Sequence, residues 1–399
     1  MIADIRNQFN AQFSQERYRT FLDDLSAQFN HIPAFRVAES PIFVPAILKH
    51  KLFTACHQVA NCILRPDFGQ ITEASMTPGT KVPNENEHTK FLQMDFGLCL
   101  DKKGEIEPML IEVQGFPSLY FYQDFIARMY RKHFDIPSDI NHLFNGLNSD
   151  AYANMLKDII VGDEDPNEVV LMDVEPFKQA TQIDFHAAHK ATGIKIACVQ
   201  DIFKQGDKLC YKNEKGQTVI IKRLFNRVIF DELMSRQDLE LRFKFTDEHD
   251  VHWVGHPNWF FRISKYMMPF IECDFMPETI FLDKLNRIPD DLENYVLKPL
   301  FSFSGTGVIF HVKPEDIEQV KDKSQYILQR KVQYVPVIQT DEGDAVKVEV
   351  RIMMVWPEGA PRPMLVNNLA RLSRGEMIGV KFNKDKTWVG GSVGFYEGE

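Results

Sequence analysis

The chain has 399 residues, and its 44% of hydrophobic and 26% of charged residues are ordinary for a soluble globular protein with a substantial core. A formal net charge of −10 argues against a general binder of nucleic acids or of anionic membranes, so we expect neither as a partner. No apolar run is long enough to span a bilayer, and the first residues have a polar helical pattern without a signal-peptide core. The six cysteines include no C-x-x-C pair, which favours free thiols in a reducing compartment. We therefore expect a cytoplasmic protein.

Residues 1–90 are predicted to be mainly helical. Apolar side chains recur at helical spacing through residues 3–30, and a second helical pattern covers Val44–Leu64. A polar loop that contains Pro and Gly follows at residues 77–87. Nothing in this region points to a chemical role.

Polar side chains on a predicted hairpin form the first candidate site. Phe91–Leu100 and Met109–Gln114 are predicted as strands joined by a turn, which brings Asp95 close to Glu112. Alternation along the second strand places Glu112 and Gln114 on one face. Carboxylate and amide oxygens are hard ligands that suit Mg²⁺. The alternative is a solvated acidic hairpin face, which the apolar neighbours of these residues disfavour.

The middle of the chain has the pattern of an open α/β sheet. Helices are expected across residues 119–165, and strands alternate with a helix after them. The predicted elements are the strand Val169–Val174, the helix Lys178–Thr192, the strand Ile194–Val199, and further strand at Thr218–Leu224 and Val228–Phe230. His249, His252 and His256 have spacings that would suit a zinc site on a helix. Nearby Gly and Pro residues break such a helix, so a loop with incidental histidines is the better interpretation.

A lysine and a glycine-containing turn form the second candidate site. Tyr295–Leu297 and Val308–Phe310 are predicted as short strands that flank the turn, with Lys298 at the end of the first strand. Gly305 and Gly307 would let backbone N–H groups fold over an anion, and Lys298 would add a positive charge beside it. An ordinary Gly-containing hairpin explains the loop alone equally well.

The C-terminal part of the chain is predicted to contain long strands. The expected elements are the helix Glu315–Lys323 and the strands Tyr326–Val332, Val346–Trp356 and Met364–Leu372. Alternation places Lys347, Glu349 and Arg351 on one face of the longest strand. For Arg351 alone, a structural ion pair is a serious alternative to a functional role.

These two sites together resemble a known family. The hairpin with Asp95, Glu112 and Gln114, followed by Pro and Ser, resembles the magnesium motif of the ATP-grasp ligases. Lys298 with its turn resembles their nucleotide lysine and glycine-rich loop. Here the magnesium motif precedes the loop by nearly two hundred residues. That order resembles the circularly permuted ATP-grasp proteins, the group that holds eukaryotic glutathione synthetase and glutathionylspermidine synthase.

The resemblance, which covers about residues 90–399, implies a mixed α/β (α+β) architecture. The implied fold is a circularly permuted ATP-grasp fold with a pre-ATP-grasp-like α/β domain. Its implied segments are an N-terminal helical region at 1–90, a magnesium-motif segment at 91–165, the pre-ATP-grasp-like domain at 166–275 and the nucleotide-binding subdomains at 276–399.

The resemblance also implies ATP and Mg²⁺ as cofactors, with Mg²⁺ on Asp95, Glu112 and Gln114. The residues implied in ATP binding are Lys265, Lys298, Ser302, Ser304, Gly305, Thr306, Gly307, Gln329, Lys331 and Val332. The residues implied in catalysis are Arg351 and Arg371, which would steady the γ-phosphate and the acyl-phosphate, and those implied in substrate binding are Ser118 and Arg223. Gln114 stands where Asn is usual in the family, and residues 301–308 lack the carboxylate that glutathione synthetase uses as a metal ligand.

The implied activity is an ATP- and Mg-dependent carboxylate–amine ligase that forms a C–N bond through an acyl-phosphate. Its substrates would be a small-molecule carboxylate and an amine, on an amino acid or peptide-like scaffold. The two departures leave open a nucleotide-binding protein without ligase turnover. A metal-dependent hydrolase or an α/β binding protein is a third interpretation. The sequence does not fix the substrates or the oligomeric state, and a homodimer is compatible with it.

Overall fold

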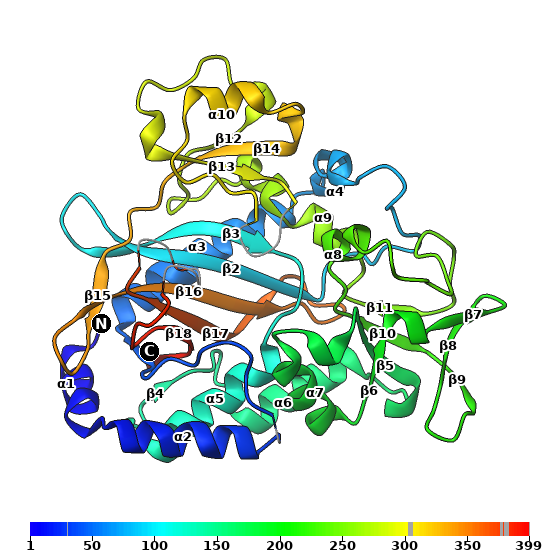
Figure 1. Ribbon diagram of the computed structural model, residues 1–399, viewed down its shortest axis with the longest axis horizontal. Coiled ribbons are helices and arrows are strands. Elements are labelled where there is room, and N and C mark those ends of the chain that lie inside the picture. Colours follow the sequence, from blue (N-terminus) through cyan, green and yellow to red (C-terminus); the bar gives the residue numbers. More distant parts are fainter. Residues whose placement is uncertain (30, 302–305, 376–377, 379–382, 399) are drawn as a thin grey trace.

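The computed structural model describes residues 1–29, 31–301, 306–375, 378 and 383–398 (Figure 1). A six-stranded antiparallel sheet, here called the main sheet, joins distant parts of the chain. In sheet order its strands are β18 (Gly390–Ser392), β17 (Met364–Ser373), β16 (Ala345–Val355), β2 (Phe91–Leu100) and β3 (Ile106–Gln114), and β15 (Pro336–Gln339) also pairs with β16. The predicted β2–β3 hairpin is confirmed, and β2 pairs directly with β16 from the C-terminal part of the chain.

The helices lie around the sheets of the molecule. They are α1 (Ala3–Gln12), α2 (Gln15–Ala27), α3 (Ala46–Ile63), α4 (Phe68–Ile71), α5 (Tyr120–His133), α6 (Ser149–Ile160), α7 (Gln182–Thr192), α8 (Phe230–Ser235), α9 (Asn258–Arg262) and α10 (Pro314–Gln319), with short 3₁₀ turns that include η5 (Lys265–Phe270). The helical patterns predicted before residue 65 are confirmed as α1, α2 and α3. The apolar residues of α1 and α2 form a buried stripe, with Phe9, Phe21 and Leu25 at most 1% exposed. The N-terminal helices therefore belong to the same core as the main sheet.

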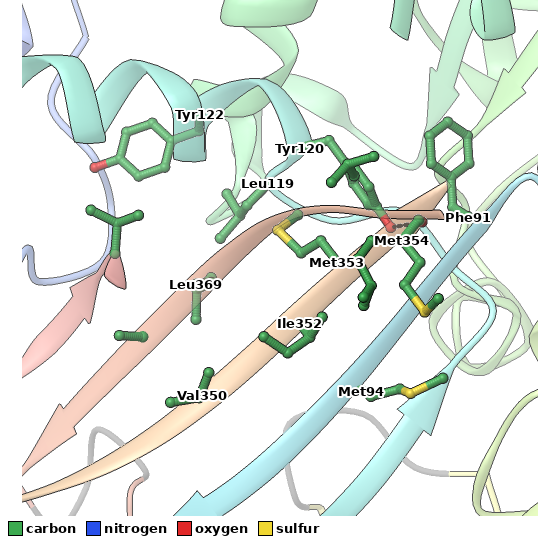
Figure 2. Close-up of a cluster of buried hydrophobic side chains, with 14 of the residues drawn as sticks. Phe91, Met94, Leu119, Tyr120, Tyr122, Val350, Ile352, Met353, Met354 and Leu369 are labelled. Atoms are coloured by element: carbon green, nitrogen blue, oxygen red, sulfur yellow. Dashed lines mark hydrogen bonds between the residues drawn. The ribbon is translucent and has the colours of Figure 1, made fainter. Parts of the chain in front are cut away.

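The main sheet has an apolar face and a polar face, because side chains alternate along each strand. On the apolar face, Met94 and Ile352 lie in one cluster of buried side chains with Tyr120 of α5 (Figure 2). The Tyr120 hydroxyl donates to the carbonyl oxygens of Leu92 and Met354, over 3.1 and 2.8 Å. This packing leaves the opposite face of β2 and β16 for polar side chains.

A four-stranded parallel sheet confirms the predicted open α/β region. Its order is β11 (His252–Val254), β10 (Arg223–Asn226), β5 (Val169–Asp173) and β6 (Lys195–Cys198), all parallel. Helix α7 connects β5 to β6, as predicted. The predicted strand at Thr218–Leu224 is instead divided between β9 (Thr218–Ile220) and β10, which belong to different sheets, and Phe230 begins α8 rather than ending a strand. His252, expected in a loop, begins β11.

A three-stranded antiparallel sheet carries Lys298. Its order is β12 (Thr279–Phe281), β14 (Tyr326–Arg330) and β13 (Tyr295–Pro299), and α10 belongs to the same unit, drawn at the top of Figure 1. The strand predicted at Val308–Phe310 is reduced to a single bridge between Ile309 and Leu297. β13 therefore has its only continuous partner, among the described strands, in β14.

Two small sheets complete the fold. Their strands are β1 (Ile42–Val44), β19 (Gly394–Glu397) and β4 (Ile140–Asn141) in one, and β7 (Phe203–Gln205), β8 (Lys208–Lys212) and β9 in the other. The parallel pairing of β1 with β19 brings the N-terminal and C-terminal parts of the chain together. Among the described helices, none combines the length and the apolar character needed to cross a membrane.

Candidate functional site

Charged side chains gather on the polar face of the main sheet and form what we call the charge network. Its members are Asp95, Glu112, Glu349, Lys265, Lys298, Arg351 and Arg371. Strand register places Asp95 of β2 opposite Arg351 of β16 on one side and opposite Glu112 of β3 on the other. Directly opposed residues of antiparallel strands lie on the same face of a sheet. The sequence-predicted hairpin and the long alternating strand therefore contribute to one site.

The buried centre of the network is a fork-to-fork ion pair. Nε and Nη2 of Arg351 donate to the two carboxylate oxygens of Asp95, over 2.5 and 2.6 Å. Nη1 of Arg351 donates to Oε1 of Gln93, 2.9 Å away. Asp95 is 2% exposed and Arg351 5% exposed, so this pair is removed from water. A planar guanidinium matches both oxygens of a carboxylate, which fixes the orientation of both side chains.

A second pair lies beside the first. Arg371 of β17 is ion-paired with Glu349 of β16, and its Nη1 lies 3.4 Å from Oδ2 of Asp95. The Tyr334 hydroxyl donates to the other oxygen of Glu349, over 2.8 Å. The Arg371 side chain is 34% exposed, against 7% for that of Glu349. Arg371 is therefore the arginine through which the network reaches solvent.

A glycine in β2 allows Tyr334 to reach this position. A Cβ on Gly97 would lie 2.7 Å from Cγ1 of Val332 and 2.9 Å from the ring of Tyr334, closer than side-chain carbons approach. Without that Cβ, the segment after β14 crosses over β2, and Val335 donates its N–H to the carbonyl of Leu98. The sequence signal for this crossing is a single glycine inside a strand.

Two lysines extend the network beyond the main sheet. From β13, Nζ of Lys298 donates to the carbonyl oxygen of Ile111, 3.1 Å away, and to Oε1 of Gln329, 2.5 Å away. From η5, Nζ of Lys265 lies 3.9 Å from Oε2 of Glu112. Both lysines are 8% exposed. Separate elements thus place two ammonium groups beside the end of β3.

Burial and neighbouring charges shift the protonation of these groups. Burial lowers the pKa of Lys298 to about 8, with the charge of Lys265 acting in the same direction and that of Glu112 opposing it. Burial acts to raise the pKa of Asp95, but the charges and hydrogen bonds of Arg351 and Arg371 outweigh it and hold that pKa below the usual value. Burial raises the pKa of Glu349, against the opposing charge of Arg371. The charge of Lys298 therefore changes just above neutral pH.

The residues predicted to bind Mg²⁺ come together, but three of their four carboxylate oxygens accept hydrogen bonds from the protein itself. Both oxygens of Asp95 accept hydrogen bonds from Arg351. Oε1 of Glu112 accepts from Nε2 of Gln114 over 2.6 Å, so the amide of Gln114 is turned towards that carboxylate with its nitrogen. In the described part of the chain, no group of three or more His, Cys, Asp or Glu side chains is placed to hold a metal ion. In this arrangement the three residues do not form an open oxygen set for Mg²⁺.

Only some of the residues predicted to bind ATP lie at the charge network in the part of the chain that the structure describes. Ser302, Ser304 and Gly305 lie outside the described residues, and Thr306 and Gly307 are exposed just after them. Among the others, Gln329 of β14 is buried and holds Lys298, whereas Nζ of Lys331 donates to the carbonyl of Glu293 over 2.6 Å, and Val332 packs above Gly97. Of this set, Lys265, Lys298 and Gln329 therefore contact the charge network or belong to it.

The two residues predicted to bind substrate lie apart from each other. The carbonyl oxygen of Ser118 accepts a hydrogen bond from Nε2 of Gln93, 2.8 Å away, which ties the loop after β3 to the network. Arg223, at the start of β10, donates to the carbonyl oxygens of Ile160 and Ile159 over 2.9 and 2.8 Å. These are carbonyls at the C-terminal end of α6, so the guanidinium of Arg223 caps that helix.

A different arginine, Arg227, has the features of an anion-binding residue. It directly follows β10, at the carboxyl edge of the parallel sheet, and is 3% exposed. Its Nε and Nη1 have no hydrogen-bond partner among the described residues, and its guanidinium lies over the rings of Phe116 and Phe185, 4.9 and 5.2 Å from their centroids. In open parallel sheets, ligands bind beyond the carboxyl ends of the strands. Arg227 was not predicted as a site residue because strands were predicted on both sides of it, which obscured the strand end.

Two acidic side chains act electrostatically on Arg227. Asp173 ends β5 and Asp184 lies in α7, and the charges of both act to keep Arg227 protonated against its burial. Burial raises the pKa of Asp173 to about 7, with the charge of Arg227 opposing it. The carboxylate of Asp184 accepts hydrogen bonds from backbone N–H groups at the start of α5. Because Phe116 belongs to the same loop as Ser118, one loop links this arginine to the charge network.

The comparisons with known proteins identify a fold. No family model matches the sequence, and no curated protein matches it. Among solved structures, the chain is similar to a glutathione synthetase-like effector from Globodera pallida in its apo form, with a TM-score of 0.59 and 9% sequence identity. The match covers 97% of this chain and 98% of that one. The protein therefore has a mixed α/β fold of the glutathione synthetase-like kind.

Proposed function

We propose that the protein is an ATP-dependent carboxylate–amine ligase that acts through an acyl-phosphate on an amino acid or peptide-like substrate. The observation that carries this proposal is that one loop, residues 115–119, contacts both the charge network and Arg227. The charge network lies at one end of the loop, where Gln93 bonds to Ser118, and the buried Arg227 lies over Phe116 in the same loop. A phosphate donor bound at the charge network and a carboxylate bound at Arg227 would therefore lie close to each other, next to this loop.

Each cation has a role in this proposal. Lys298 and Lys265 would contact the phosphates of ATP, and the exposed side of Arg371 would bind the transferring phosphoryl group, with Arg351 behind it. Arg227 would hold a substrate carboxylate through its unpartnered Nε and Nη1. Phosphoryl transfer depends mainly on such positioning and charge neutralisation. Because the predicted metal ligands do not form an open set of oxygens, the proposed reaction has no step that involves Mg²⁺.

The reaction would proceed in two displacements. An oxygen of the substrate carboxylate attacks the γ-phosphorus, the bond from that phosphorus to the bridging oxygen breaks, and ADP leaves. The nitrogen of the amine then attacks the acyl carbon, inorganic phosphate leaves, and the amine loses a proton to solvent. The acyl-phosphate is sensitive to water, so the loop around Thr306 and Gly307 would have to cover it during the reaction.

A second candidate function is nucleotide binding without turnover. It is favoured by the pairing of Asp95 with Arg351 and of Glu112 with Gln114, which engages three of the four carboxylate oxygens that would hold a metal. The two candidates share the nucleotide site and differ in the chemical step. Calorimetric titration with ATP, on wild type and Lys298→Ala, tests the shared part. Saturable binding that the substitution abolishes supports both candidates, and a folded wild type that binds no ATP refutes both.

Turnover and the Arg227 position are tested by ADP release in mixtures of amino acids, peptides and amines. We expect release that depends on both a carboxylate and an amine. Arg227→Lys keeps the positive charge but removes the paired N–H donors of the guanidinium. We therefore expect the KM for the carboxylate to rise about 10- to 100-fold, as for the loss of a charge-assisted hydrogen bond. The affinity for ATP should stay unchanged. The exposed Arg242→Lys is the matched control. ATP binding without release in any mixture would favour the second candidate.

A further inference from the structure

The carboxylates of the charge network are already matched by cations of the chain itself. Asp95 contacts Arg351 and Arg371, Glu349 contacts Arg371, and Glu112 has Lys265 3.9 Å from its Oε2. Three acidic side chains of the network thus face four basic ones. The network therefore has an excess of basic side chains although the chain has a net charge of −10.

Accommodating Mg²⁺ at Asp95 would require this arrangement to break. Mg²⁺ demands an octahedral shell of oxygens at short distance. Asp95 would have to release Arg351 at a position that is 2% exposed, which would leave the guanidinium buried with Gln93 as its remaining partner. Removing one member of a buried ion pair is strongly unfavourable. A polyphosphate anion, by contrast, could bind the exposed part of Arg371 and the lysines without breaking the buried pair of Asp95 with Arg351.

We propose that this site binds the polyphosphate of a nucleotide directly, without a divalent cation, and that Arg371, Lys265 and Lys298 supply the positive charge. The inference rests on the proposed nucleotide site and adds which side chains balance the charge of the bound polyphosphate. Asp95 and Glu349 then serve as positioning residues, which hold the two arginines on the sheet. Glu112 is an anion that competes with the bound phosphates for the same lysines.

Glu112 distinguishes binding of ATP through Mg²⁺ from metal-free binding. Its removal should weaken ATP binding in the first case and strengthen it in the second. As a metal ligand, Glu112 would be needed for ATP binding in the presence of Mg²⁺. As a competing anion next to Lys265 and Lys298, it weakens the binding of phosphates, and its loss strengthens it. Its side chain is 25% exposed and, among the residues that the structure describes, is not ion-paired with an arginine, so we expect Glu112→Gln to keep the fold.

The experiment is calorimetric titration of the full chain with ATP, in EDTA and in excess Mg²⁺, with inorganic tripolyphosphate as a second ligand. The variants are Glu112→Gln and the matched control Glu107→Gln, which makes the same change on the same strand, β3, further from the lysines. We expect wild type to bind ATP in EDTA within about threefold of its affinity in Mg²⁺. Glu112→Gln should bind about tenfold tighter in EDTA, as for the loss of one nearby opposing charge, and Glu107→Gln should match wild type.

The other possible outcomes distinguish a failure of the metal-free inference from a failure of the proposed function. Binding of ATP by wild type only in Mg²⁺, lost in Glu112→Gln, overturns the metal-free inference and leaves the proposed function intact. Metal-free binding of tripolyphosphate without binding of ATP refutes both the proposed ATP site and the binding of a nucleotide, and leaves a metal-free site for inorganic polyphosphate. No binding of either ligand by folded wild type overturns both. Equal affinities of Glu112→Gln and wild type in EDTA refute the competing role of Glu112 and with it the proposed charge balance.

Discussion

Replacing Lys298 by Met should change how the stability of the protein depends on pH. Lys298 is 8% exposed, and burial lowers its pKa from 10.5 to about 8. Between these two pH values the unfolded chain keeps the proton that the folded chain has lost, so the free energy of unfolding rises with pH. Below about pH 8 both states are charged and the full cost of burying the ammonium is present. Met fills a similar volume and has no charge, so the variant lacks this rise.

The size of the effect follows from the pKa. At 1.36 kcal/mol per pH unit, a fall from 10.5 to about 8 corresponds to about 3.4 kcal/mol of destabilisation by the buried charge. By pH 9.5 about 2 kcal/mol of this should be recovered in wild type. The hydrogen bonds from Lys298 to Ile111 and Gln329 are lost in the variant at every pH, so they shift its stability by a constant amount. The pH-dependent difference between the two proteins is therefore specific to the charge.

The assay is urea unfolding of wild type and Lys298→Met at several values between pH 7 and pH 9.5, followed by tryptophan fluorescence. We expect the stability of wild type, relative to the variant, to increase by about 2 kcal/mol across this range. The control is Lys215→Met in the exposed turn after β8, for which the difference from wild type should stay constant. A difference for Lys298→Met that is also constant with pH would refute the placement of a charged, buried lysine in this site.

Two further substitutions test the roles of individual side chains. Asp95→Asn removes the carboxylate that pairs with Arg351 and Arg371 and should lower the free energy of unfolding by about 3–5 kcal/mol in urea. A loss below about 1 kcal/mol would show that the pair is not the buried centre described here. Arg223→Met removes two hydrogen bonds to the end of α6 and should cost about 1–3 kcal/mol in the same assay, with unchanged ATP affinity. Unchanged stability with loss of substrate binding would instead favour the substrate role that the family resemblance implies for Arg223.

The sequence predicted the elements that carry strong periodicity. The hairpin that holds Asp95 and Glu112 and the long alternating strand that holds Glu349 and Arg351 are both present, because period-two alternation over many residues has no other simple explanation. Alternation also identified the face that these residues share. What it could not supply was the pairing between β2 and β16, which depends on contacts across about 250 residues of chain.

Other parts of the site depended on tertiary contacts that leave little trace in the sequence. Glu112 and Gln114 were correctly placed on one face, but their mutual hydrogen bond and the engagement of Asp95 by arginines depend on neighbouring strands. Arg223 and Arg227 are four residues apart on and just after one strand, and only the position of the strand end distinguishes a helix cap from a buried guanidinium with unpartnered nitrogens. Element boundaries are set by packing as much as by local sequence.

The pairing of β2 with β16 also has a consequence for synthesis of the protein on the ribosome. β2 is completed at Leu100, but its central partner begins at Ala345, about 245 residues later. At about 5–20 residues per second, the nascent chain carries an unpaired edge of β2 for about 12–50 seconds. Nine of the ten residues of this strand are buried once the fold is complete. A long, apolar strand with an open edge is prone to pair with other chains, so we expect this segment to be bound by chaperones while the C-terminal strands are still being made.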